Sequence, residues 1–198
     1  EEIFIWNLPQ QLKSLHLHSF IEISRGYIKM LPRSLLELQI ALCPDEKEYK
    51  KDVQLPRHLT RLKLSNVASD SIMTWIPAFV THLELCRLKD EEKIAHWTPI
   101  PPNLELLALN VPSFIDAIWV QQLPQSLTDL TIFSKGFNKP DLLRLLPRGL
   151  TSLKLPGTTF HELTAAQLSA LPPNLTHIQA ECTASISTQQ LVDLLPSQ

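Results

Sequence analysis

Several residue types that mark common protein classes are scarce in this sequence. Glycine occurs only four times, and no glycine-rich phosphate-binding loop is present. The three cysteines, Cys43, Cys86 and Cys182, are odd in number and scattered, which is unlike a disulfide framework or a zinc site. This slightly favours a reducing, cytoplasmic compartment, although one glycosylation sequon, Asn174-Leu175-Thr176, points the other way, so the localisation stays undetermined.

Long apolar runs and an excess of one charge are missing as well. No apolar stretch approaches the roughly 18 residues that a membrane-spanning helix needs, so we expect no membrane insertion. The net charge is −2, which gives no basic field to attract nucleic acid. Apolar residues make up 44% of the chain, enough for a continuous core.

The sequence does contain one pattern that recurs along the whole chain. It consists of Leu-Pro, two variable residues and then Leu-x-x-Leu-x-Leu, and it is clearest at Leu123–Ile132. Copies 21 to 25 residues apart, some with Ile for Leu, start at Leu8, Leu31, Leu55, Ile76, Ile100, Leu123, Leu146 and Leu171, and a truncated ninth starts at Leu195. Self-similarity at this period indicates a solenoid.

Each repeat divides into a strand half and a return half. The leucines alternate with polar residues, which predicts a short strand with one buried face, and the proline fits just outside it. We therefore expect a parallel sheet of about eight strands. In the return halves the sequence predicts a Gly-Tyr turn within Phe20–Met30 and short helices over 69–76, 90–97, 113–123, 140–146, 165–171 and 188–195. Trp75, Trp97 and Trp119 would pack in this outer layer.

The repeat resembles the leucine-rich repeat family, over roughly Trp6 to Ser197. The run Phe137-Asn138-Lys139-Pro140 is also similar to FNIP-type variant repeats. The resemblance implies an α/β solenoid of eight repeats plus a truncated ninth. Its curved parallel sheet would form the concave face, and short helices and loops the convex face. It implies binding of macromolecules on the concave sheet, without catalytic residues or cofactors.

The chain departs from the family pattern in the turn that follows each strand. Leucine-rich repeats usually carry Asn or Cys nine positions into the segment, where the side chain bonds the backbone of neighbouring turns. Here only Cys43 fits among the equivalent residues, which are Phe20, Cys43, Val67, Leu88, Pro112, Lys135, Thr158 and Thr183. We therefore expect the turns to be held together in another way.

We expect residues 1–198 to form a single solenoid domain that is a fragment of a longer chain. The sequence starts just before one repeat and stops inside another, without an obvious capping repeat at either end. Trp6 at one uncapped end and Leu195-Pro196 at the other could therefore support self-association.

The strand register predicts three columns of residues on the concave face. The first column is Ser14, Glu37, Arg61, His82, Leu106, Asp129, Ser152 and His177. The second is His16, Gln39, Lys63, Glu84, Ala108, Thr131, Lys154 and Gln179, and the third is His18, Ala41, Ser65, Cys86, Asn110, Phe133, Pro156 and Glu181. Their variety suits a specific partner, but an unconstrained solvated face would look the same.

The centre of these columns is the candidate partner-binding site. Apolar side chains surrounded by charges are typical of a binding hot spot. The candidate residues are Arg61, Lys63, Glu84, Cys86, Leu106, Ala108, Asp129, Thr131 and Phe133. The alternative interpretation is that the turn partly buries the third column and leaves only Leu106 and Ala108 exposed.

Other chemistry is weakly indicated. His16 and His18 share a strand face but lack further metal ligands nearby. His82, Glu84 and Cys86 resemble parts of a thiol site, but a flat parallel strand offers no oxyanion hole. Arg33, Arg57 and Arg148 share one repeat position, and Gln10, Ala78 and Gln125 interrupt this basic ridge, so no nucleic acid is expected.

The sequence thus favours a non-catalytic module that binds a protein partner on its concave face. A second hypothesis is a structural component that packs through its open ends or convex face. A third is the substrate-recognition arm of an enzyme such as a ubiquitin ligase, whose catalytic part would lie outside this sequence.

Overall fold

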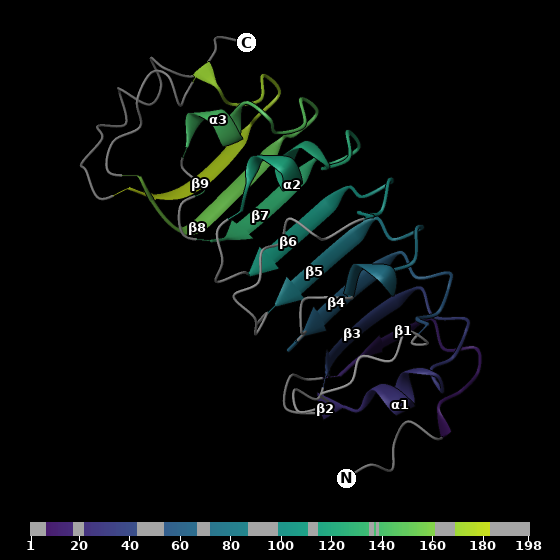
Figure 1. The fold of residues 1–198 in the computed structure, drawn as a ribbon. Coiled ribbons are helices and arrows are strands. Elements are labelled where there is room, and N and C mark those ends of the chain that lie inside the picture. Colours follow the sequence, from purple (N-terminus) through teal and green to yellow (C-terminus); the bar gives the residue numbers. More distant parts are fainter. Residues whose placement is uncertain are drawn as a thin grey trace.

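The computed structural model describes residues 7–17, 22–42, 54–66, 72–86, 99–110, 115–134, 137, 139–160 and 169–182. The strands of these segments form one parallel sheet, in which each repeat adds a strand beside the previous one. Short helices lie along one face of this sheet (Figure 1). We call the opposite face the open face.

The elements follow the repeats along the chain. The strands are β1 (Ser14–His16), β2 (Glu22–Ile23), β3 (Glu37–Leu42), β4 (Arg61–Ser65), β5 (His82–Cys86), β6 (Leu106–Asn110), β7 (Asp129–Phe133), β8 (Ser152–Phe160) and β9 (His177–Cys182). The helices are α1 (Arg25–Ile28), the 3₁₀ helix η2 (Ile72–Thr74), α2 (Ala117–Gln121) and α3 (Pro140–Leu143). The order β1-β3-β4-β5-β6-β7-β8-β9 confirms the predicted solenoid sheet.

A tight turn precedes every strand and includes the proline of the repeat. In all eight repeats the N–H of the residue three positions after the proline donates to the proline carbonyl, at 3.0–3.4 Å. Leu12 and Pro9 form the first such pair, and Leu175 and Pro172 the last. The Pro-x-x-Leu segment is therefore a β-turn, and the row of these turns defines what we call the turn edge of the sheet.

A ladder of threonine hydrogen bonds joins the turns to one another. The Thr128 carbonyl accepts the backbone N–H groups of Thr151 and Ser152, at 2.9 and 3.0 Å, and the Thr151 hydroxyl, at 3.1 Å. The same hydroxyl bond is made by Thr60, Thr81, Thr128 and Thr176. Threonines ahead of the strands thus make inter-repeat side-chain bonds of the kind that Asn or Cys usually makes after them.

Polar side chains within the turns add a second set of bonds between repeats. The hydroxyl of Ser34 lies 2.7 Å from two carbonyls of the preceding turn, and Ser126 occupies the same position four repeats later. The Asn174 side chain donates to the Arg148 carbonyl at 3.1 Å. Asn174 therefore has a structural role at the turn. This role is sufficient to explain why the position is an asparagine.

The core lies between the sheet and the return segments. Strand leucines that alternate with polar residues are almost fully buried, as in Leu83 and Leu85 of β5 and Leu107 and Leu109 of β6, all at most 1% exposed. The turn leucines Leu104 and Leu127 are fully buried too. The predicted alternation is confirmed, and burial of these side chains is the main stabilising term of the fold.

The return segments agree with the predictions in part. Helix α3 begins at Pro140 as expected, and Trp75 and Trp119 are buried in the outer layer. Helix α2 is shorter than predicted, because it begins after Asp116, whose side chain caps the Trp119 N–H at 2.9 Å. Residues 72–74 form one 3₁₀ turn rather than an α-helix.

The prediction of a Gly-Tyr turn in the first return segment was wrong. Gly26 and Tyr27 lie within helix α1. Ile23 and Ile28, which flank them, are both 2% exposed. One helical turn between these two positions allows both isoleucines to reach the core, which outweighs the helix-weakening effect of the glycine.

Two irregularities interrupt the regular sheet. Strand β3 has two partners on one side, because β1 pairs with its start and β2 pairs with its end. Strand β8 is unusually long, and its register with β9 shifts between Leu155 and Thr159. Glu181 therefore pairs with Thr159, and the prediction that Pro156 lies beside Glu181 was wrong.

Several predicted features lie outside the described residues. They are the helix over 90–97, the helix over 188–195, most of the helix over 165–171, Trp6, Trp97, His18, Cys43, Asn138 and the truncated repeat at Leu195-Pro196. The single-domain boundaries also stay a prediction.

The strand register predicts a strong contrast between two adjacent leucines. Leu107→Ala should lower the free energy of unfolding by about 2–5 kcal/mol, because Leu107 is 1% exposed. Leu106→Ala should cost about 1 kcal/mol or less, because this side chain lies half-exposed on the open face. Urea unfolding followed by circular dichroism gives both values, and equal losses would contradict the register.

The threonine ladder predicts a smaller, position-specific effect. Thr151→Val should lower the free energy of unfolding by about 0.5–1.5 kcal/mol, because it removes one hydroxyl bond between repeats and keeps the side-chain shape. Thr131→Val on β7 is the matched control, since no hydrogen bond joins its hydroxyl to another described residue. The control should change stability by less than about 0.5 kcal/mol in the same urea titration.

Candidate functional site

The strand register assembles the predicted columns on the open face. In the first column Glu37, Arg61, His82, Leu106 and Asp129 are consecutive partners across five strands. The second column runs in the same way from His16 through Gln39, Lys63, Glu84, Ala108, Thr131 and Lys154 to Gln179. The third is formed in parts, as Ala41–Ser65–Cys86 and as Asn110–Phe133. Ala41 is only 1% exposed, so the prediction that it lies on the open face was wrong. All nine candidate residues therefore lie on strands β4 to β7.

The first part of the open face carries interlocked charges. Arg61 Nη1 lies 3.2 Å from Glu37 Oε1, and the other oxygen of Glu37 lies 3.7 Å from His16 Nε2. On the next pair of strands Lys63 Nζ lies 2.7 Å from Glu84 Oε2. Ion pairs this exposed add at most about 1 kcal/mol each to stability. Their main effect is to hold charged side chains in defined positions across β3, β4 and β5.

The Lys63–Glu84 pair shifts the titration of the lysine. The hydrogen bond to Glu84 raises the pKa of Lys63 above its ordinary value of 10.5, and burial acts in the opposite sense. The negative charges of Glu84 and Cys86 raise the pKa further. Because folding raises this pKa, the pair stabilises the folded chain at neutral pH, and that contribution is lost as the pH rises through the raised pKa.

A shallow hollow of about 260 Å³ lies over these charged strands. Four of the nine candidate residues line it, namely Arg61, Lys63, Glu84 and Leu106. His16, Glu37, Gln39 and His82 complete most of its surface. Most of the lining side chains are polar or charged, and Leu106 contributes apolar surface to the same hollow.

The apolar part of the face begins at Leu106. Leu106 and Ala108 on β6 are half-buried, and Asp129 and Thr131 are their direct neighbours on β7. Phe133 ends β7 and is 45% exposed. Phe133 is therefore accessible on the open face. The alternative interpretation, in which only Leu106 and Ala108 stay exposed, is therefore wrong for Phe133.

Neither a metal site nor a thiol site is assembled in the described part of the chain. No group of three or more His, Cys, Asp and Glu side chains is placed there to hold a metal ion. Glu84 accepts a hydrogen bond from Lys63, and His82 Nδ1 lies 2.9 Å from the Thr81 hydroxyl. His82, Glu84 and Cys86 occupy alternate positions of strand β5.

Sequence reasoning missed a second surface, at the turn edge. It noted that Arg33 and Arg57 share one repeat position, but it gave no role to Lys29, His58, Leu36 or Phe79. These six side chains line two neighbouring hollows beside the turns of the second, third and fourth repeats. Arg148, at the same position in the seventh repeat, lines neither hollow.

Comparison with known proteins identifies the architecture. The crystal structure of CroV588, described as a novel circular LRR protein structure, is similar with a TM-score of 0.56 and 25% sequence identity. The chain has a leucine-rich-repeat fold. Solenoids of this fold are typically protein-interaction modules and generally have no enzymatic activity.

The extent of that likeness is limited in one respect. The match covers 86% of this chain but only 24% of CroV588. No family model matches the sequence, and no curated protein matches it. The similarity to FNIP-type repeats therefore stays a prediction. Among the described helices, none is long and apolar enough to cross a membrane.

The raised pKa of Lys63 predicts a direct effect of removing its partner. Glu84→Ala should lower the pKa of Lys63, because both the hydrogen bond and the negative charge are lost. Glu37→Ala is the matched control and should leave this pKa unchanged, since Glu37 pairs with Arg61. The chemical shift of the Lys63 Cε atom, followed by NMR through alkaline pH, measures both. An unchanged pKa in Glu84→Ala would contradict the pairing.

Proposed function

We propose that this chain is a non-catalytic interaction module that binds a partner protein on the open face of its sheet. The observation that carries the proposal is the apolar centre formed by Leu106, Ala108 and Phe133, next to the charged residues of β3 to β5. Association gains most from apolar side chains at the centre of a contact, and a polar rim around them excludes water and selects the partner.

The rigidity of the open face supports this proposal. Every candidate residue projects from a strand whose backbone is paired on both sides. The ion pairs Arg61–Glu37 and Lys63–Glu84 hold long side chains that would otherwise lose freedom on binding. A surface ordered in advance loses less conformational entropy when a partner docks, so more of the contact energy becomes affinity.

The charges also define the chemistry of the partner surface. Each pair presents one basic and one acidic group side by side, so a complementary partner would present alternating charges of its own. Such complementarity selects among partners and sets their orientation more than it adds affinity. We infer a folded protein surface with an apolar protrusion that meets Leu106 and Phe133, flanked by groups of both charges.

The alternatives drawn from the sequence rest on other parts of the chain. Assembly through open ends would involve Trp6 and Leu195-Pro196, which lie outside the described residues. A role as the substrate-recognition arm of a ubiquitin ligase would use the same open face, with the catalytic part elsewhere. No observation on the described residues specifically supports either of these two alternatives.

The proposal predicts which substitutions abolish partner binding. A binder selected from a displayed protein library against the intact chain should lose at least about tenfold in affinity to Leu106→Asp and to Phe133→Asp. Ile118→Asp is the matched control, because Ile118 is an equally apolar side chain, 62% exposed on helix α2. Binding to this control should be unchanged, as measured by surface plasmon resonance.

Circular dichroism and urea unfolding establish that each variant is folded before binding is compared. Binders that tolerate Leu106→Asp and Phe133→Asp but not Ile118→Asp would place recognition on the convex side. That result would overturn the proposal.

A further inference from the structure

The turn edge carries a basic hollow that no part of the proposed open-face site uses. It encloses about 500 Å³ and lies between helix α1 and the turns of the second and third repeats. Lys29, Arg33, Arg57 and His58 supply its polar wall, and Leu31, Leu55 and Pro56 supply apolar surface beneath them. None of the residues that line it is acidic.

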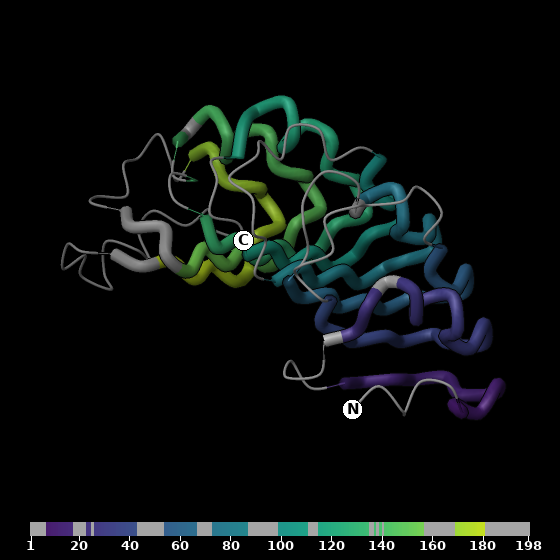
Figure 2. Tube along the Cα trace, turned by 60° about the horizontal axis from the view of Figure 1, so that its bottom comes forward, coloured from purple at the N-terminus to yellow at the C-terminus, as the bar shows by residue number. Residues whose placement is uncertain are grey.

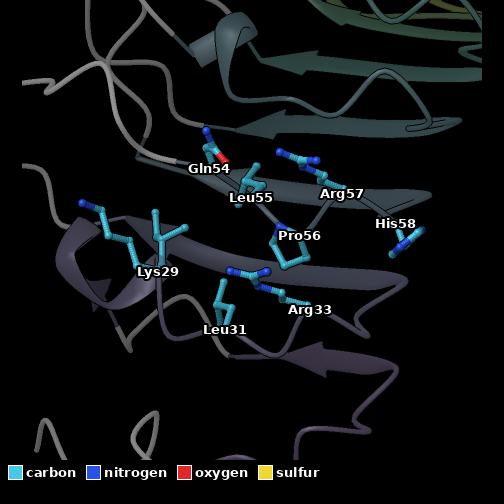
Figure 3. Close-up of a pocket in the computed structure, with 9 residues that line it drawn as sticks. Lys29, Leu31, Arg33, Gln54, Leu55, Pro56, Arg57 and His58 are labelled. Atoms are coloured by element: carbon cyan, nitrogen blue, oxygen red, sulfur yellow. The ribbon is translucent and has the colours of Figure 1, made fainter.

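The arrangement of these side chains concentrates positive charge. Arg33 and Arg57 occupy the same turn position in consecutive repeats, and both side chains extend toward the end of the hollow where Lys29 and Gln54 lie (Figure 3). Within the described segments, no carboxylate forms an ion pair with Lys29, Arg33 or Arg57. Three cations around one hollow repel one another, and an anionic ligand would relieve that repulsion.

An apolar groove continues directly from the basic hollow. It encloses about 510 Å³ and is lined by Lys13, Ser34, Leu36, His58, Thr60 and Phe79. Phe79 is 68% exposed and Leu36 is 39% exposed, which are high values for large apolar side chains. His58 lines both spaces, so the groove and the hollow form one surface.

From these neighbouring subsites we propose that the turn edge of the second to fourth repeats binds an acidic peptide segment of a partner protein. Carboxylates of the segment pair with Arg33 and Arg57, whose planar guanidinium groups each present two parallel donors to a carboxylate. A large apolar side chain of the same segment packs on Phe79 and Leu36. The site is separate from the open face, because the turns lie at the ends of the strands.

The pattern along the turn edge favours a peptide over a nucleic acid. The position of Arg33 and Arg57 is occupied by Gln10 in the first repeat and by Ala78 and Pro102 in the fourth and fifth. The basic surface thus ends after two repeats, whereas a nucleic-acid backbone is held by an extended series of cations. The adjoining groove exposes Leu36 and Phe79, which fit a hydrophobic side chain better than a phosphate.

The test uses a fluorescein-labelled peptide with glutamates on both sides of a central phenylalanine, titrated against the full chain by fluorescence anisotropy. The double variant Arg33→Glu with Arg57→Glu should weaken binding by at least about tenfold, as expected for loss of charge-assisted bonds. Arg148→Glu is the matched control, because Arg148 holds the same turn position in the seventh repeat, outside the hollow. It should change the affinity by less than about twofold.

The apolar subsite has its own pair of variants. Phe79→Ser should weaken binding of this peptide, and a peptide with serine in place of phenylalanine should bind both proteins equally weakly. Ile118→Ser, which removes an exposed apolar side chain elsewhere, should have no effect. Leu106→Asp should leave peptide binding intact, so the outcome is independent of the proposed open-face function. Urea unfolding verifies that every variant is folded.

Several results would overturn the proposal. One is the absence of measurable binding to the glutamate peptide, and another is an equal loss of binding in Arg148→Glu, which would indicate a general charge effect. Tighter binding of single-stranded oligouridylate through the same arginines would assign the surface to nucleic acid. Binding only after the glutamates are replaced by phosphoserines would assign the anion to phosphate.

Discussion

The carbonyl group of the residue just before each strand is the acceptor on which the rest of the structure depends. At every junction between the eight repeats, this one oxygen accepts two backbone N–H groups from the following repeat. At five junctions it accepts a threonine hydroxyl as well. The bonds make successive strands start level, so leucine stacks on leucine through the core. A slip of one residue would turn the buried side chains outward.

Both candidate surfaces follow from that common starting level. On the open face it aligns unlike charges across neighbouring strands, as in Glu37 with Arg61 and Lys63 with Glu84. At the turn edge it places like charges together, because Arg33 and Arg57 occupy the same turn position in consecutive repeats. Figure 2 shows the sheet as a ladder of near-parallel segments from the N-terminal to the C-terminal repeats. One backbone arrangement therefore produces a charge-paired face and an edge where cations gather.

The sheet and its columns were predictable because a two-residue alternation and a fixed repeat length determine both. The return segments were less so: Gly26 lies in a helix because Ile23 and Ile28 must both be buried, a tertiary requirement that local propensity does not contain. One feature of the sequence reflects the register shift between β8 and β9: the spacing between the repeat starts Leu146 and Leu171 is the longest in the chain. The turn-edge site was not predictable, because it combines helix α1 with turns whose relative placement exists only in the folded chain.

The uniform junction also bears on how such a chain can change over generations. Any repeat presents the same acceptor carbonyl to its successor and the same donors to its predecessor. Exchanging a whole repeat therefore replaces one residue in each surface column and one set of turn residues, and duplicating a repeat adds them. In both cases the junction bonds can form again. Recognition can in this way be rewritten in units of about two dozen residues by recombination, without redesign of the leucine core.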